Sequence, residues 1–323
     1  MNQFSKIILS SICVLLLITV TALAANADQL YDLAFGRKTM KEILVSEGLE
    51  TPEKLQRYNR YVGALEENQK WLDQEKAETV YIESNDGLKL HAYYLKGKSN
   101  STKTIIIAHG YRASSVEMVS YAKYFRDHYG FNVLLPDARA HGQSEGKYIG
   151  MGWPDRLDYL QWTQWTLQRT GKSSEIILFG SSMGGATMMM LSGEKLPPQV
   201  KFIVEDCGFS STESILSYQI QNRTAFPVEL LLGSLKTYIQ VKFGYSLEEA
   251  SAIEQVRKKT VPMIFIHGDA DTIVPVSMVY QVYEAAPEPK ALLVIPGAEH
   301  VRAFNDEKAR ILVDTYIKKY LSP

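Results

Sequence analysis

Phe179-Gly180-Ser181-Ser182-Met183-Gly184-Gly185-Ala186 is the stretch that decides the fold. It contains the pattern G-x-S-x-G with Ser182 at its centre, and it joins a short apolar run to a helical pattern. In this strand–turn–helix context the glycines keep side chains away from a strained turn, and the serine hydroxyl projects above the sheet. The motif therefore predicts a nucleophile at Ser182, whereas Ser181 has the wrong register. A dinucleotide-type glycine turn is disfavoured, because no G-x-G-x-x-G occurs here.

Short apolar runs alternate with longer helical patterns on both sides of this motif. The apolar runs are 79–83, 88–95, 104–108, 131–136, 175–179, 201–205, 263–267 and 292–295. The helical patterns between them are 114–129, 154–169, 184–193, 276–286 and 305–320. Such alternation predicts an α/β fold with a doubly wound, mostly parallel sheet. Ligands bind such sheets beyond the carboxyl ends of the strands, so the residues that follow each run are the candidate site.

Two further regions lie outside this alternation. Residues 28–78 have apolar residues at helical spacings among many charges, which predicts a helical arm ahead of the α/β domain at 79–323. Residues 211–258 read as three helices, 211–223, 227–242 and 247–258, in a connection too long for a simple crossover. We interpret them as a lid whose apolar residues line an acyl pocket or pack against the core.

A serine nucleophile needs a base, and the base needs an acid that orients it. In chain order these follow the serine as acid and then histidine. His300 follows the last apolar run and is the candidate base. Asp269 and Asp271 both follow the run before it; we favour Asp271, which lies deeper in the loop, and interpret Asp269 as a turn residue.

Two backbone N–H groups are candidates for stabilising an oxyanion, those of Met183 and Tyr111. The histidines before glycine at strand ends, His109 and His267, are interpreted as residues that fix turns. The loop that begins at Asp137 and contains His141 is interpreted as a hydrogen-bonded support for the site. One Asp and one His without further ligands are a weak metal signal, so we expect no metal and no organic cofactor.

Taken together, these motifs resemble the α/β-hydrolase superfamily from about residue 79 to the end of the chain. They are similar to bacterial single-domain serine hydrolases related to the prolyl-oligopeptidase-like and serine-aminopeptidase-like branches. The pieces that carry the resemblance are His109-Gly110, Asp137-x-Arg139-x-His141-Gly142-x-Ser144, Gly180-x-Ser182-Met183-Gly184-Gly185, His267-Gly268-x-x-Asp271-x-x-Val274-Pro275 and Gly297-x-x-His300. The resemblance implies Ser182, Asp271 and His300 as a catalytic triad, Tyr111 and Met183 as oxyanion donors, and a lid at 211–258. It leaves the substrate open.

Composition narrows the function classes. The chain of 323 residues is 46% hydrophobic and 22% charged, with a formal net charge of −1, so we expect no nucleic-acid partner. We expect hydrolysis of a small-molecule carboxylic ester through an acyl-enzyme. The alternatives are a serine peptidase or amidase with the same triad, and a non-catalytic surface binding protein on the same fold. Cys207 is expected to be a small buried residue at a strand end.

The first 27 residues have the pattern of an export segment. Lys6 precedes an apolar run over 7–25, and alanines at 22, 24, 25 and 27 offer small residues for cleavage. The run is also close to the roughly 20 residues that span a bilayer, so a cleaved signal peptide and a retained membrane anchor both stay open. Either form places the body outside the cytoplasm, secreted or attached to the membrane.

Overall fold

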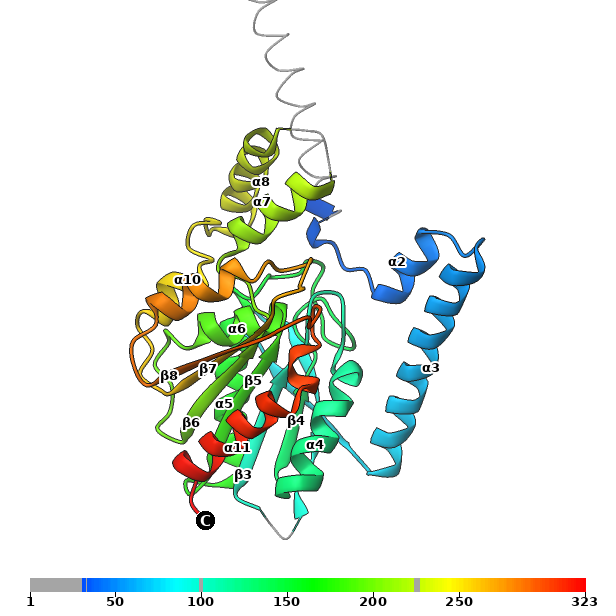
Figure 1. The fold of residues 1–323 in the computed structure, drawn as a ribbon. Helices are drawn as coiled ribbons and strands as arrows, with labels where there is room; N and C mark the ends of the chain where they lie inside the picture. Colours follow the sequence, from blue (N-terminus) through cyan, green and yellow to red (C-terminus); the bar gives the residue numbers. More distant parts are fainter. Residues whose placement is uncertain (1–30, 33, 99–100, 224–226) are drawn as a thin grey trace, which may run out of the picture.

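The computed structural model describes residues 31–32, 34–98, 101–223 and 227–323. Within these ranges an eight-stranded sheet has the order β1-β2-β4-β3-β5-β6-β7-β8 (Figure 1). β1 and β2 run antiparallel to their neighbours, and β3 to β8 are parallel. The strands are β1 (Glu78–Glu83), β2 (Lys89–Leu95), β3 (Lys103–Ala108), β4 (Asn132–Pro136), β5 (Glu175–Ser181), β6 (Val200–Asp206), β7 (Met263–Gly268) and β8 (Lys290–Ile295). All eight predicted runs are strands.

Helices cover both faces of the sheet, which confirms the doubly wound prediction. One face packs against α5 (Asp155–Thr170), α6 (Met183–Leu191), α9 (Ala252–Val256) and α10 (Ser277–Ala285), and the other against α4 (Val119–Tyr129) and α11 (Glu307–Tyr320). Because successive side chains of a strand point to opposite faces, β5 sends Ile176 and Leu178 into the first core and Ile177 and Phe179 into the second.

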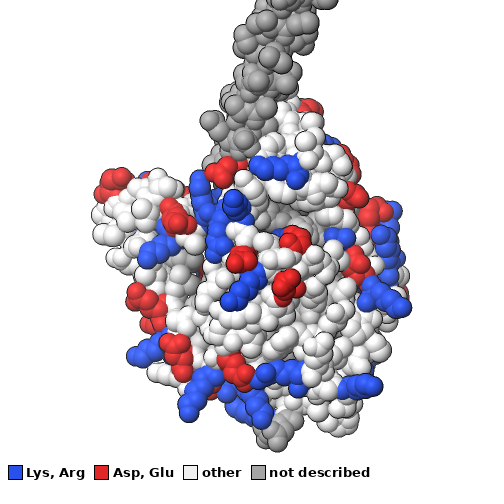
Figure 2. All heavy atoms as spheres, turned by 180° about the vertical axis from the view of Figure 1, so that it is seen from behind, with Lys and Arg blue, Asp and Glu red and all other residues white. Residues whose placement is uncertain are grey.

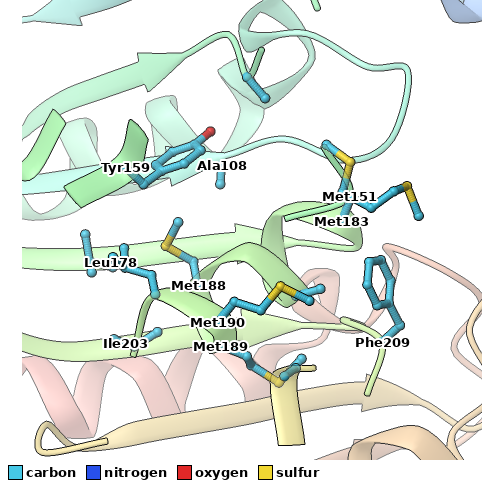
Figure 3. Close-up of a cluster of buried hydrophobic side chains, with 14 of the residues drawn as sticks. Ala108, Met151, Tyr159, Leu178, Met183, Met188, Met189, Met190, Ile203 and Phe209 are labelled. Atoms are coloured by element: carbon cyan, nitrogen blue, oxygen red, sulfur yellow. The ribbon is translucent and has the colours of Figure 1, made fainter. Parts of the chain in front are cut away.

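The helix that follows the G-x-S-x-G motif has no solvent-exposed side. Every residue of α6 is buried, and Met188, Met189 and Met190 gather with Ile203 and Phe209 in one apolar cluster (Figure 3). Unbranched methionine side chains fill irregular gaps, so they suit a helix enclosed all round. The turn at Ser182 is therefore fixed by the core itself.

The insertion between β6 and β7 consists of α7 (Thr212–Arg223), α8 (Val228–Phe243) and α9. Leu232, Leu235 and Ile239 of α8 are buried, whereas Leu230 is 63% exposed. The predicted helix at 247–258 is wrong in extent, since only Ala252–Val256 is helical. Ser246 and Glu249 bond each other's backbone N–H groups, and Ser251 bridges to Ser211, which holds the preceding residues in a turn.

The insertion also contacts the loop that carries the candidate acid. From α7, the Tyr218 hydroxyl donates to the carbonyl of Thr272 at 3.3 Å, and the Gln219 amide donates to the carbonyl of Ile273 at 2.6 Å. The insertion thus braces residues next to Asp271. Opening and closing as a lid stays a prediction.

The helices α2 (Met40–Ser46) and α3 (Pro52–Gln74) precede β1 and lie to one side of the sheet, where α3 contacts η2 (Ser115–Met118). Threonine N-caps begin both, Thr39 and Thr51, each accepting a backbone N–H of the first turn. Ahead of them, Arg37 donates to the carbonyls of Gly142 and Ser144, both at 2.6 Å. We call residues 31–74, as far as they are described, the arm.

The export segment predicted at 1–27 lies outside the described residues. None of the helices described after it combines the length and the apolar character needed to span a membrane. On the face shown in Figure 2, acidic and basic side chains are interspersed, in keeping with a net charge of −1.

Candidate active site

The candidate residues come together because they follow strands that are neighbours in the sheet. Ser182 comes directly after β5, Asp271 after β7 and His300 after β8, and Tyr111 follows β3 on the other side of β5. These strands are parallel, so their carboxyl ends meet at one edge. The structure therefore brings these four predicted positions together at one edge of the sheet.

Ser182 lies at a sharp turn whose shape depends on glycine. Its φ is +57°, a left-handed value that side chains rarely adopt. A Cβ at Gly180 would lie 2.1 Å from the carbonyl oxygen of Gly184, and a Cβ at Gly184 would lie 2.3 Å from that of Ala108. Both glycines are therefore required where the turn packs against itself and against β3.

A chain of hydrogen bonds joins the three predicted side chains. The Ser182 hydroxyl lies 2.9 Å from Nε2 of His300, and Nδ1 of His300 lies 2.6 Å from Oδ2 of Asp271. If Nδ1–H donates to the carboxylate, Nε2 is left to accept the serine proton, which is the arrangement that general-base activation needs. Asp269 lies elsewhere: its carboxylate accepts the N–H of Gly297 at 2.6 Å, as expected of a turn residue.

The carboxylate of Asp271 is held ionised by its partners. Burial raises its pKa, but hydrogen bonds from His267 and His300 outweigh burial and hold the pKa well below its usual range. Its other oxygen, Oδ1, accepts the N–H groups of Ile273 at 2.8 Å and Val274 at 2.9 Å. His267 thus does more than fix a turn, since its Nε2 lies 3.4 Å from Oδ2 of the acid and 2.9 Å from the carbonyl of Val274.

The two predicted oxyanion donors flank the serine. Met183 is the first residue of α6, so its N–H has no carbonyl within the helix to bond. On the other side, a Cβ at Gly110 would lie 3.3 Å from Cβ of Ser182, which shows how closely the 110–111 backbone approaches the nucleophile. This position suits the N–H of Tyr111 as the second donor, and the Tyr111 hydroxyl bonds the carbonyl of Ala34 in the arm.

The loop after β4 supports this backbone, as predicted. Nε2 of His141 accepts the N–H of Arg112 at 3.0 Å, and Asp137 accepts the N–H of Ser115 at 2.7 Å. His109 ties the two loops together, because its Nε2 accepts the N–H of Ala138 at 2.9 Å. Burial lowers the pKa of His141 to about 3, so this ring is neutral and able to accept.

A cavity of about 310 Å³ opens onto the serine. The arm, the loop after β3, α4 and the loop after β8 all contribute to its wall. Its residues are Met40, Gly110, Tyr111, Ala113, Glu117, Met118, Ser120, Tyr121, Ser181, Ser182, His300, Val301, Arg302 and Asn305. No described residue of the insertion lines it, and Ile215 and Leu232 are buried in packing; Phe226 lies outside the described residues.

Met40 and Glu117 are two residues of this wall to which the sequence pattern assigned no role at the site. Met40 belongs to the arm, and Glu117 belongs to η2 (Ser115–Met118), within the first turn of the helical pattern predicted over 114–129. A single acidic residue in such a pattern is typical of a solvated helix face. Glu117 differs from such a solvated residue because the folded arm contacts it through Tyr61.

One group of described side chains has the spacing of a metal site. Ligand atoms of Cys207, Asp271 and His300 lie within 4.8 Å of one another. Asp271 and His300 already bond each other at 2.6 Å, so a cation there would compete with the contact that orients the imidazole. Cys207 is buried, 1% exposed, directly after β6 as predicted, and burial raises the pKa of its thiol.

Comparisons with known proteins fit this geometry. A family model described as alpha/beta hydrolase fold matches residues 103–230, and one described as serine hydrolase matches residues 167–308. The uncharacterized protein YqkD of Bacillus subtilis is 29% identical over 70% of this chain and 74% of its own length. The uncharacterized protein YfhR of Escherichia coli K12 is 26% identical over 76% of this chain and 81% of its own length.

Solved structures with the same fold include named esterases. The Pyrococcus furiosus esterase Pf2001 superposes with a TM-score of 0.62 at 25% identity, covering 78% of this chain and 96% of that one. An acetyl xylan esterase from Paenibacillus sp. R4 gives a TM-score of 0.57 at 15% identity, covering 80% and 93%, and this shows likeness of fold alone.

Proposed function

Because the chain belongs to the α/β-hydrolase superfamily and is a hydrolase, we propose that it cleaves small-molecule carboxylic esters with Ser182, His300 and Asp271 as its triad. The observation that carries the proposal is the hydrogen-bonded chain of 2.9 Å and 2.6 Å that ends at a cavity. The likeness to an esterase at 25% identity supports the ester rather than another acyl substrate.

The reaction follows from the geometry in two steps. His300 takes the proton of Ser182 through Nε2 while Oγ bonds to the ester carbonyl carbon, and the N–H groups of Tyr111 and Met183 stabilise the oxyanion. The tetrahedral species collapses, the alcohol leaves with the proton from His300, and Ser182 holds the acyl group. Water, deprotonated by His300, then releases the acid and restores the serine. Asp271 stays ionised throughout and holds the imidazole in the required tautomer.

A substrate panel tests this proposal. p-Nitrophenyl esters of two to twelve carbons are compared with aminoacyl p-nitroanilides, with Ser182→Ala as the blank. The proposal expects ester turnover that Ser182→Ala abolishes. Turnover of anilides without esters would instead identify an amidase or peptidase, and no turnover of either class would favour a binding protein on this fold.

We also propose that the protein works outside the cytoplasm, secreted or attached to a membrane through its N-terminal segment. The support is the sequence alone: Lys6, the apolar run over 7–25 and the small residues that follow. Amino-terminal sequencing of the protein from medium and membrane fractions tests it. A mature terminus near residue 28 indicates a cleaved signal, an intact terminus in the membrane fraction indicates an anchor, and an intact terminus in cytosol contradicts the proposal.

A further inference from the structure

Glu117 is an acid in the wall of the cavity that opens onto Ser182. It lies in η2, at the end of the loop that supplies the Tyr111 backbone, and it is partly buried where the arm contacts it. The hydroxyl of Tyr61, on α3, donates to its Oε1 at 3.0 Å, and the amide of Asn68 fixes the adjacent carbonyl of Val116 at 3.0 Å. The arm thus holds this carboxyl in a set position at the cavity.

Within the described part of the chain, Glu117 has hydrogen-bond donors, the Tyr61 hydroxyl and the Ser114 backbone, but no cationic partner. Among the described side chains, no lysine, arginine or histidine forms an ion pair with Glu117, and the charge that acts on it, that of Asp137, is also negative. Burial raises the pKa of Glu117 to about 7. Arg302 also lines the cavity, but it is exposed, so solvent screens its charge more than that of Glu117.

A half-buried carboxylate without a counter-ion, facing an open cavity, is a site for a cation that arrives with the substrate. We propose that the cavity takes an ester carrying a primary ammonium group, which the Glu117 carboxylate binds while Ser182 attacks the carbonyl. The inference rests on the proposed ester hydrolysis and names its substrate class. Glu117 acts as a binding and specificity residue, held in place by Tyr61.

Steady-state kinetics with pairs of esters, one charged and one neutral, test the preference for an ammonium group. Methyl esters of glycine, 3-aminopropanoate and 6-aminohexanoate are compared with methyl propanoate, butanoate and heptanoate, and 2-aminoethyl acetate is compared with propyl acetate. In each pair, the charged ester has an ammonium group where the neutral ester has a methyl group. We expect kcat/KM for at least one charged ester to exceed its neutral partner about tenfold or more, the effect of one charge-assisted hydrogen bond. The preference should grow as pH rises through 7, because Glu117 then loses its proton.

Variants separate recognition from a purely structural role. Glu117→Gln keeps the shape of the side chain and is expected to remove the advantage in kcat/KM that a charged ester has over its neutral partner. Tyr61→Phe, a second variant in case the first misfolds, is expected to reduce the preference. Glu66→Gln removes an exposed acid of α3 as a matched control and should change nothing. A change in melting temperature without a change in preference is the result of a structural role and overturns the proposal.

A binding measurement makes the inference independent of turnover. In Ser182→Ala protein labelled with ¹³C-glutamate, the pKa of Glu117 is followed by NMR with butylammonium and, separately, with butanol. We expect butylammonium to lower the pKa of Glu117 and butanol to leave it unchanged. A pKa unmoved by butylammonium, or equal kcat/KM for every charged and neutral pair, overturns the inference. A lowered pKa in a protein that hydrolyses no ester refutes the proposed function instead.

Discussion

Replacing Asp271 by asparagine exchanges one carboxylate oxygen for an NH₂ group. It therefore tests whether Asp271 orients the imidazole of His300, the proposed base. Oδ1 of Asp271 accepts two backbone N–H groups, from Ile273 and Val274, at 2.8 and 2.9 Å. An asparagine must keep its carbonyl oxygen there, since turning the amide would set donors against donors. Its NH₂ group then takes the place of Oδ2, 2.6 Å from Nδ1 of His300.

That exchange reverses the hydrogen bond on which the imidazole depends. Nδ1 becomes the acceptor, so the proton moves to Nε2, and Nε2 no longer accepts the proton of Ser182. By analogy with the loss of the acid in serine hydrolases, kcat is expected to fall by about 10⁴, which corresponds to about 5.4 kcal/mol in activation free energy. KM should change little, because the two backbone contacts of Oδ1 keep the loop in place. The melting temperature should fall, because the amide replaces the oxygen that accepts hydrogen bonds from His267 and His300.

The assay is steady-state hydrolysis of the best p-nitrophenyl ester, with thermal melts to verify folding. Asp269→Asn is the matched control: Asp269 accepts the N–H of Gly297, which an asparagine oxygen also accepts, and activity should stay within about twofold of wild type. A decrease of less than tenfold for Asp271→Asn in a folded protein, or a larger loss for Asp269→Asn, would refute this reasoning.

Three further predictions concern stability and reactivity. Gly184→Ala places a Cβ 2.3 Å from the carbonyl oxygen of Ala108. We expect urea denaturation to show a loss of about 3 kcal/mol or more in the free energy of unfolding, and near wild-type stability would contradict the packing of the turn. Cys207 is buried and the pKa of its thiol is raised, so the native protein should not react with a thiol reagent until denatured, and rapid native labelling would disprove this placement. Burial raises the pKa of Glu205 from 4.5 to about 8, so the folded state holds this proton more tightly than the unfolded state. The free energy of unfolding should therefore fall as pH rises from about 4.5 to 8. Glu205→Gln should flatten that decline in urea melts at several pH values, and an unchanged slope would contradict it.

Strand order allowed the sequence to predict which candidate residues lie close together. Ser182, Asp271 and His300 are far apart in the chain, but each follows a short apolar run, and parallel strands bring such positions to one edge of the sheet. The choice of Asp271 over Asp269 depended on depth in the loop. In the structure Asp271 is 6% exposed and contacts His300, whereas Asp269 contacts the N–H of Gly297.

The sequence did not predict what the arm adds. Tyr61 meets Glu117 across 56 positions in the chain, and no local periodicity encodes a contact of that separation. The same limit affected the insertion: apolar residues such as Leu232 and Ile239 showed that a face is buried, but not whether it faces the cavity or the core. Both questions are settled by packing between distant segments.

The central claim is that Ser182 is the nucleophile, and a fluorophosphonate probe tests it most directly. Wild-type protein and Ser182→Ala are treated with the probe, digested and mapped by mass spectrometry, with Ser181→Ala as the control for the neighbouring hydroxyl. The account predicts a single adduct on Ser182 in wild type and in Ser181→Ala, and none in Ser182→Ala. An unlabelled wild type, or a Ser182→Ala variant labelled as fully as wild type, would contradict it.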